Sequence, residues 1–151
     1  RGINTLFEAA KEVTKSNTDI TFVFSGRIGH KIKIPGFIKY LGYLSDSEVA
    51  NLIKSLDILV VTNKNTKFGN YSYPVKLYEA MANNVPVIVS NTESTSWIMK
   101  ENQDLLVEPE NAKALSEKII EIIHQDYIHY EKQQSWEDIT NKLENIIEKV
   151  S

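Results

Sequence analysis

The chain has 151 residues, with 17 basic and 20 acidic side chains and a formal net charge of −3. Its 42% hydrophobic and 25% charged residues are typical of globular proteins, which excludes disordered, collagen-like and disulfide-rich classes. It contains no cysteine, so disulfides, thiolate nucleophiles and cysteine-based zinc sites are excluded. The length predicts one domain, residues 1–151, and no apolar run approaches the ~18 residues of a membrane span.

Apolar residues alternate between helical and strand-like spacing along the chain. Asn4 is the expected N-cap of the first helix, Ser45 to Glu48 form a capping box, and Pro74 suits the first turn of another helix. In chain order we expect a helix at 3–13, strands at 20–24 and 37–41, a helix at 45–56, a strand at 57–61, a helix at 74–82, a strand at 86–89, a short helix at 94–100, a strand at 105–107, and helices at 111–123 and 135–150.

Near-continuous apolar strands that alternate with helices predict an α/β class. The expected architecture is a Rossmann-like, doubly wound parallel sheet of about five strands with helices on both faces. A strand normally opens such a fold and lies in the middle of the sheet. Because a helix comes first here, we expect that first strand to be missing from this sequence.

Open parallel sheets bind ligands outside the carboxyl ends of their strands, which selects the loops at 25–29, 42–45, 62–73 and 90–93. The longest of them, 62–73, precedes a helix whose free N–H groups and partial positive charge favour a phosphate or carboxylate. Basic residues are in excess between Arg27 and Lys76. They could steer a small anionic ligand, and scattered solvated lysines remain the alternative.

The sequence contains no motif with the residue spacing that other common binding or catalytic sites require. The stretch Gly26-Arg27-Ile28-Gly29 is not a dinucleotide fingerprint, and neither a phosphate loop nor a Gly-x-Ser-x-Gly elbow occurs. His30, His124 and His129 are dispersed, which predicts neither a metal site nor a catalytic triad. No basic stripe with interleaved aromatic residues occurs, so we expect no nucleic-acid partner.

Several stretches follow one another in a recognisable order. They are residues 1–6, 40–44, 56–61, 74–88, 105–107 and 135–137, and the most specific is Glu79-Ala80-Met81-Ala82 followed by Pro86-Val87-Ile88. Together they resemble the C-terminal half of GT-B glycosyltransferases, the large retaining family 4 in particular. The resemblance implies a domain that binds a nucleotide-sugar donor, such as a UDP or GDP sugar used in polysaccharide or glycan biosynthesis. It also implies a separate N-terminal acceptor-binding domain, a cytoplasmic location, and peripheral membrane association through that missing domain.

The resemblance also implies roles for individual residues. Glu79 matches the second glutamate of the family's Glu-x7-Glu motif, which accepts hydrogen bonds from the donor ribose. Arg1 matches the lysine of the phosphate clamp, and Arg1 and Lys76 are the expected catalytic residues that stabilise the leaving phosphate. The other implied donor contacts are Gly26, Leu41, Gly42, Tyr43, Phe68, Gly69, Asn70, Tyr71, Pro74 and Leu77.

Three departures from the family pattern leave the donor's identity open. Tyr71 stands where the first glutamate is expected, although Pro74 and Lys76 look like a Pro-x-Lys variant of the motif. Thr92-Glu93 replaces a Gly-Gly pair that lets backbone approach the sugar. The segment between the strands at 20–24 and 37–41 is too short for the usual helix.

The expected function is therefore retaining, metal-independent glycosyl transfer without a cofactor, with this chain alone turning over poorly or not at all. Two alternatives stay open. A sugar-nucleotide epimerase has the same architecture and would interconvert the free donor without an acceptor. A non-catalytic α/β module would instead dock a partner through the helix that carries Trp136.

Overall fold

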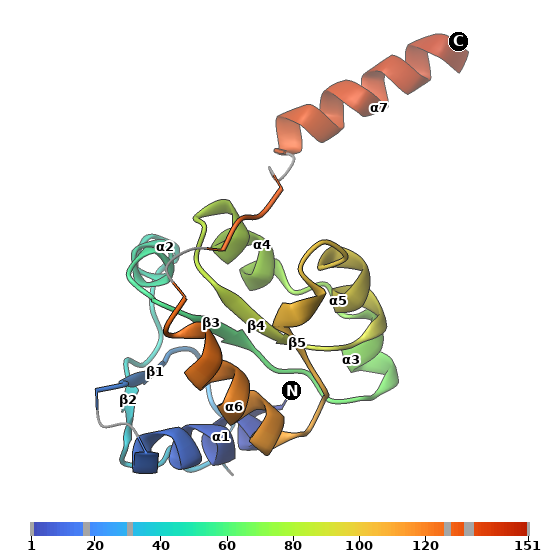
Figure 1. Cartoon of the computed structure of the whole chain (residues 1–151). Helices are drawn as coiled ribbons and strands as arrows, with labels where there is room; N and C mark the ends of the chain where they lie inside the picture. Colours follow the sequence, from blue (N-terminus) through green and yellow to red (C-terminus); the bar gives the residue numbers. More distant parts are fainter. Residues whose placement is uncertain (1, 17–18, 30–31, 126–127, 132–134, 151) are drawn as a thin grey trace.

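The computed structural model describes residues 2–16, 19–29, 32–125, 128–131 and 135–150. Figure 1 shows a layered α/β body and a C-terminal helix that extends away from it. The elements are α1 (Ile3–Ser16), β1 (Phe22–Phe24), β2 (Ile38–Tyr40), α2 (Asp46–Lys54), β3 (Leu59–Val61), α3 (Lys67–Tyr71), α4 (Val75–Ala82), β4 (Val87–Ser90), α5 (Glu93–Ile98), a 3-10 turn (Gln103–Leu105), β5 (Leu106–Val107), α6 (Ala112–Ile122) and α7 (Trp136–Val150).

The predicted α/β class with parallel strands is confirmed. The pairs β1–β2, β3–β4 and β4–β5 are all parallel, with Val23 opposite Lys39 and Val60 opposite Ile88. The strands are hydrogen-bonded into two sheets, of order β1-β2 and β3-β4-β5, where one sheet was expected. The described residues therefore provide two parallel sheets whose strands run in the order β2-β1 and β3-β4-β5.

Helices cover both sides of the strands. In Figure 1, α1 and α6 lie side by side on one side, and α2 and α4 lie on the other. All four residues of β4 are buried, so this strand is the centre of the main core. Its apolar neighbours come from α4, α6 and β5, as the helical spacing of 75–82 and 112–122 dictates.

Helix α1 joins the two sheets. Its Ala9 and Val13 belong to the main core, whereas Phe7 and Ala10 pack with Ile38 of β2 in a second, smaller cluster. The Phe7 and Phe24 rings meet edge to face at 6.2 Å, a favourable aromatic geometry. One amphipathic helix thus holds together strands that share no hydrogen bonds.

Local signals set most helix ends where the sequence predicts them. Ser45 and Glu48 form the expected capping box, and the Ser45 hydroxyl and backbone N–H lower the pKa of Glu48 by donating to its carboxylate. Asn4, expected as an N-cap, lies inside α1 because the helix begins at Ile3. The loop expected at 62–73 contains the short helix α3, and a 3-10 turn precedes β5.

Helix α7 is amphipathic, and none of its residues is buried. Its apolar side chains are exposed along one stripe: Trp136, Ile139, Leu143, Ile146, Ile147 and Val150. Ser135 caps it, because the Asp138 N–H donates to its hydroxyl at 3.1 Å. Within the described ranges, no helix has both the length and the apolar character required to span a bilayer.

A buried tyrosine supports the start of β4. Tyr130 is 4% exposed, and its hydroxyl accepts a 2.9 Å hydrogen bond from the Val87 N–H. Burial, above all, raises the pKa of Tyr130 to about 12. The phenol therefore stays protonated in the fold at pH values where an unfolded chain begins to ionise it.

We expect Tyr130→Phe to lower the free energy of unfolding by about 1–3 kcal/mol near pH 7, because the Val87 N–H loses its acceptor. Above pH ~10 the unfolded state binds fewer protons than the fold, so the stability that Tyr130 contributes falls as pH rises toward about 12. The difference in the free energy of unfolding between the parent and Tyr130→Phe should therefore become smaller as pH rises. Denaturant unfolding at pH 7 and 11 measures both, with exposed Tyr71→Phe as control; an unchanged stability at pH 7 would contradict the role of the hydroxyl.

Candidate functional site

The carboxyl ends of β1, β2 and β3 open onto one large cavity of about 1620 Å³. Because the strands are parallel, the loops that follow them gather at the same edge of the fold. Gly26, Tyr43, Phe68, Pro74 and Lys76 line this mouth of the cavity. The cavity continues from the mouth into the space between β1 and β3.

The loops after β1 and β2 are tied together by two glycines. The Gly26 N–H donates to the Gly42 carbonyl at 2.8 Å, and both residues have positive φ, +114° and +72°, which favours glycine. The Tyr40 hydroxyl donates to the Gly26 carbonyl at 2.8 Å. The Arg27 guanidinium lies 5.1 Å from the centre of the exposed Tyr43 ring, in cation–π geometry. This side of the mouth therefore carries a positive charge over a flat aromatic surface.

The loop after β3 owes its shape to a third glycine. Thr66 caps α3 by accepting from the Gly69 N–H at 3.1 Å, and Gly69 is buried against the preceding turn. A Cβ atom at Gly69 would lie 1.9 Å from the Lys64 carbonyl oxygen, so only glycine fits here. Gly69 thus packs directly on the Lys64 carbonyl, whereas the side chains of Phe68 and Tyr71 point outward and are 70% and 73% exposed.

A chain of buried hydroxyls fixes the other side of the mouth. The Asn63 N–H donates to Ser90 Oγ at 3.1 Å, and Asn63 Nδ2 donates to Ser72 Oγ at 3.3 Å. Thr95 Oγ1 donates to the Ser90 carbonyl at 2.6 Å, and Ser94 Oγ to the Ser72 carbonyl at 2.9 Å. These bonds link the ends of β3 and β4 to the starts of α4 and α5. These residues were not among the predicted site residues, although a run of small hydroxyl residues after an apolar strand was a visible signal.

Lys76 and Glu79 form an ion pair on the first turns of α4. Lys76 Nζ lies 2.7 Å from Glu79 Oε2, and the two side chains are 53% and 39% exposed. Oε2 is itself buried beneath this contact, and the Lys76 ammonium compensates its charge. The Glu79 backbone is held separately, since Asn83 Nδ2 donates to its carbonyl at 2.7 Å. The pair thus combines a cation with a carboxylate that has acceptor capacity to spare.

Tyr73 and Tyr78 stack beside this pair. Their rings are 4.9 Å apart and 16° from parallel. Burial and the neighbouring Tyr73 raise the pKa of Tyr78, so it remains a neutral phenol. The stack braces the turn between the loop at 62–73 and α4.

The predicted site residues divide into three groups. Gly26, Tyr43, Phe68, Pro74 and Lys76 line the cavity, whereas Glu79 lies one turn along α4 from its lining. The residues that belong to the same loops but do not line the cavity are Leu41, Gly42, Gly69, Asn70 and Tyr71. Leu77 is fully buried in the main core, so its side chain packs and we leave it out of the candidate site. Arg1 lies outside the described residues.

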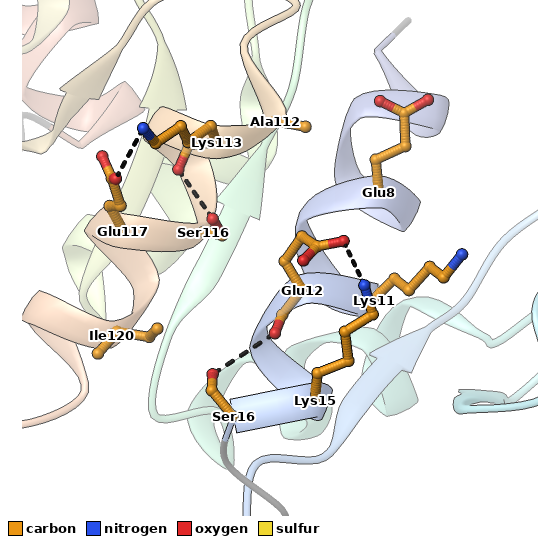
Figure 2. A pocket seen from close by; sticks show the side chains of 10 residues that line it. All are labelled: Glu8, Lys11, Glu12, Lys15, Ser16, Ala112, Lys113, Ser116, Glu117 and Ile120. Carbon is orange, nitrogen blue, oxygen red and sulfur yellow. Dashed lines mark hydrogen bonds and ion pairs between the residues drawn. The ribbon is translucent and has the colours of Figure 1, made fainter.

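A second hollow, of about 820 Å³, lies between α1 and α6 (Figure 2). Four of its six charged side chains pair within their own helices, Lys15 with Glu12 at 2.9 Å and Lys113 with Glu117 at 3.9 Å. The other two, Glu8 and Lys11, are opposite in charge. It therefore offers a ligand no converging set of free charges. In the described part of the chain, no three histidine or carboxylate side chains gather as metal ligands.

Residues 1–143 match the model of the family described as glycosyl transferases group 1. The chain is 27% identical over its whole length to an uncharacterized glycosyltransferase of Methanocaldococcus jannaschii, of which it covers 45%. It is 28% identical over 73% of its length to the O-antigen chain mannosyltransferase B of Escherichia coli, of which it covers 30%. The chain thus spans less than half the length of these curated relatives.

We expect Gly69→Ala to lower the free energy of unfolding by about 1–3 kcal/mol, as overpacking does, because the new methyl group displaces the Lys64 carbonyl. Helix propensity alone would favour alanine by ~1 kcal/mol, so the sign of the change is diagnostic. The matched control is Gly36→Ala, where a Cβ meets nothing within 4 Å. Urea unfolding compares the two, and a stabilised Gly69→Ala variant would contradict the close approach.

Proposed function

The chain belongs to the group 1 glycosyl transferases, and on that premise we propose that it is the part that binds the nucleotide-sugar donor. The donor occupies the cavity mouth at the carboxyl ends of β1, β2 and β3. The observation that carries this proposal is the Lys76–Glu79 pair on the first turns of α4, beside that mouth.

Glu79 is proposed to hold the ribose. A carboxylate accepts hydrogen bonds only, and two vicinal ribose hydroxyls offer two donors to it. The contact with Lys76 uses one lone-pair site of Oε2, and the other sites of the half-exposed carboxylate can accept from a ligand. The Asn83 bond to the Glu79 backbone keeps α4 regular at this turn, so the carboxylate is pre-oriented.

Lys76 is proposed to hold the diphosphate. An ammonium has three N–H donors, so it can keep its contact with Glu79 while it contacts a phosphate oxygen. The free backbone N–H groups at the start of α4 add the positive end of the helix dipole. Together they stabilise the charge that develops on the diphosphate as the bond from the anomeric carbon to its oxygen breaks.

The nucleobase is proposed to lie against the loops at Gly26 and Gly42. The exposed Tyr43 ring and the Arg27 guanidinium above it form a flat, positively charged surface at this side of the mouth. A purine or pyrimidine can stack there, and the choice between a UDP and a GDP sugar is made by the edge contacts of these loops. Arg1 is a proposed second phosphate ligand by resemblance alone.

The complete reaction needs more protein than this chain contains. We propose that an acceptor-binding domain covers the sugar and that transfer occurs with retention at the anomeric carbon. No step is assigned to a metal ion or cofactor, because Lys76 and the start of α4 provide positive charge at the leaving group. The acceptor, and the glycan that is made, follow from the chemistry of that other domain.

The first test is Glu79→Gln. We expect it to weaken the binding of a nucleoside diphosphate by about 1–3 kcal/mol, because the amide replaces one acceptor oxygen with a donor. Isothermal titration with UDP, GDP and ADP measures the affinity, and Glu117→Gln on α6 is the matched surface control. The proposed function fails if the parent chain binds none of the three nucleotides at millimolar concentration; equal affinities of parent and variant would remove Glu79 from the ribose site.

Lys76→Met tests the phosphate contact separately. We expect the affinity for the diphosphate to fall by about tenfold or more, as loss of a charge-assisted bond predicts, while the affinity for the corresponding nucleoside stays the same. Lys39→Met on β2 removes an equally exposed charge away from the mouth and serves as the control. Equal losses of affinity for the nucleotide and the nucleoside would show that Lys76 acts on the fold, because a residue that contacts only the phosphates affects only the affinity for the nucleotide.

A further inference from the structure

Three large aromatic side chains are exposed beside the cavity mouth, on the short helices α3 and α5. Phe68 and Tyr71 of α3 are 70% and 73% exposed, and Trp97 of α5 is 73% exposed. Single exposed apolar residues are common in proteins, whereas a group of them among polar residues marks an interaction surface. We call Phe68, Tyr71 and Trp97 together the shelf.

Helical spacing and one hydrogen bond bring the residues of the shelf to one surface. Phe68 and Tyr71 are three residues apart, so their side chains are neighbours on one face of α3. Helices α3 and α5 lie side by side (Figure 1). Ser94 Oγ of α5 donates to the carbonyl of Ser72, the residue after Tyr71. Trp97 follows Ser94 by three residues, so it lies on the face of α5 that makes this contact.

The backbone under the shelf is held from behind. Gly69 lies on the other face of α3 and packs on the Lys64 carbonyl, where no Cβ atom fits. The Ser72 hydroxyl donates to the Gly69 carbonyl at 3.2 Å and so closes the end of α3. A ligand that meets side chains on a fixed backbone loses little affinity to ordering, so this surface is prepared for binding.

The charge around the shelf is nearly balanced. The loop at 62–73 and the first turn of α4 contain three lysines and no acidic residue. Two of these lysines are paired, because Lys64 Nζ lies 3.5 Å from Glu110 and Lys76 Nζ lies 2.7 Å from Glu79. Among the described residues only Lys67 adds an uncompensated charge. Anionic membranes are held by clusters of basic residues, so this surface favours a neutral ligand over a lipid headgroup.

Amide groups lie between the aromatic rings. Asn70, which separates Gly69 from Tyr71 in the sequence, donates from Nδ2 to Asn65 Oδ1 at 3.1 Å. In the described part of the chain the two amides form no other hydrogen bond, so Asn65 keeps N–H donors and Asn70 keeps a carbonyl acceptor. A sugar ring has C–H groups on its faces and hydroxyls around its edge. Flat aromatic rings pack against the faces, and amides bond to the hydroxyls.

The shelf is continuous with the cavity mouth, because Phe68 belongs to both. We propose that the shelf binds the acceptor as a glycan chain, with sugar rings packed on Phe68, Tyr71 and Trp97. This inference rests on the proposed function, in which the donor sugar lies at the mouth. Transfer requires an acceptor hydroxyl close to the anomeric carbon, so the acceptor must pass beside the mouth. The shelf is this chain's share of acceptor binding, in addition to the acceptor-binding domain proposed above.

The position of the rings favours an oligosaccharide over a single sugar. Because the rings come from two different helices, a chain of sugar units contacts more of them than a monosaccharide does. The affinity should therefore rise with the length of the glycan.

Trp97 itself reports binding. The chain has two tryptophans, so Trp136→Phe on α7 leaves Trp97 as the single one. The probes are mannohexaose, maltohexaose and chitohexaose, with the corresponding monosaccharides as controls. We expect at least one hexasaccharide to shift the Trp97 emission to shorter wavelength with a dissociation constant of ~1 mM, and its monosaccharide to bind at least about tenfold more weakly. Unchanged emission with all three hexasaccharides up to ~20 mM would overturn the proposal.

Tyr71→Ala tests the shelf apart from the mouth. Tyr71 does not line the cavity, so loss of its ring should raise the dissociation constant of the hexasaccharide about fivefold and leave that of UDP, GDP or ADP unchanged. The matched control is Phe37→Ala, which removes an exposed ring just before β2. Equal hexasaccharide affinities of the parent and Tyr71→Ala would overturn the proposal.

The shelf and the donor site can fail separately. If the chain binds a nucleotide but no hexasaccharide, the shelf is wrong and the donor site stands. If it binds a hexasaccharide through Tyr71 but no nucleotide, the proposed function fails and the carbohydrate surface stands. Vesicles of phosphatidylcholine and phosphatidylglycerol test the membrane as the occupant by co-sedimentation. Vesicle binding that Tyr71→Ala abolishes, without hexasaccharide binding, would assign the shelf to lipid and overturn the proposal.

Discussion

The site depends on β4, the strand whose four side chains are all buried. Its neighbours β3 and β5 pair with it in parallel register, so their carboxyl ends are held level with Ser90 at its own end. Ser90 in turn bonds to the neighbouring loops: its hydroxyl accepts from the Asn63 N–H, and its carbonyl accepts from the Thr95 hydroxyl. Because these groups are buried, breaking any bond leaves a polar group without water, which makes the geometry of the mouth rigid.

That rigidity determines what the charges at the mouth can do. The Lys76–Glu79 pair is half exposed, so it contributes little to stability, and holding two opposite charges in place is of use chiefly for recognition. A nucleotide sugar has anionic phosphates next to a neutral, hydroxyl-rich ribose. A cation and a carboxylate one helical turn apart, at the positive end of α4, match that sequence of groups.

The sequence predicted elements better than connections between them. Hydrophobic spacing placed the helices and strands because it reflects which faces are buried. Ser45 marked a helix start through its capping hydrogen bonds, and Pro74 marked one because it lacks the N–H that a helix interior requires. The division into two sheets was not predicted, since strand pairing depends on distant segments. The bond from Asn63 to Ser90 and the contact of Tyr130 with β4 are likewise tertiary facts. The pairing of Lys76 with Glu79 is instead local, because residues three apart are neighbours on a helix. Leu77 illustrates the limit in the other direction: the resemblance implied a donor contact, but the helical period turns its side chain into the core.

The proposed donor site is built on both sheets. The base-binding loops at Gly26 and Gly42 stand on the β1–β2 sheet, whereas Lys76 and Glu79 are positioned by the β3–β4–β5 sheet. Among the described residues, no strand hydrogen bond joins the two sheets, and they are held together by side-chain packing that includes α1, α2 and Phe22 of β1. A ligand that contacts both halves must therefore also fix the distance between them, at a cost in conformational entropy that lowers its affinity.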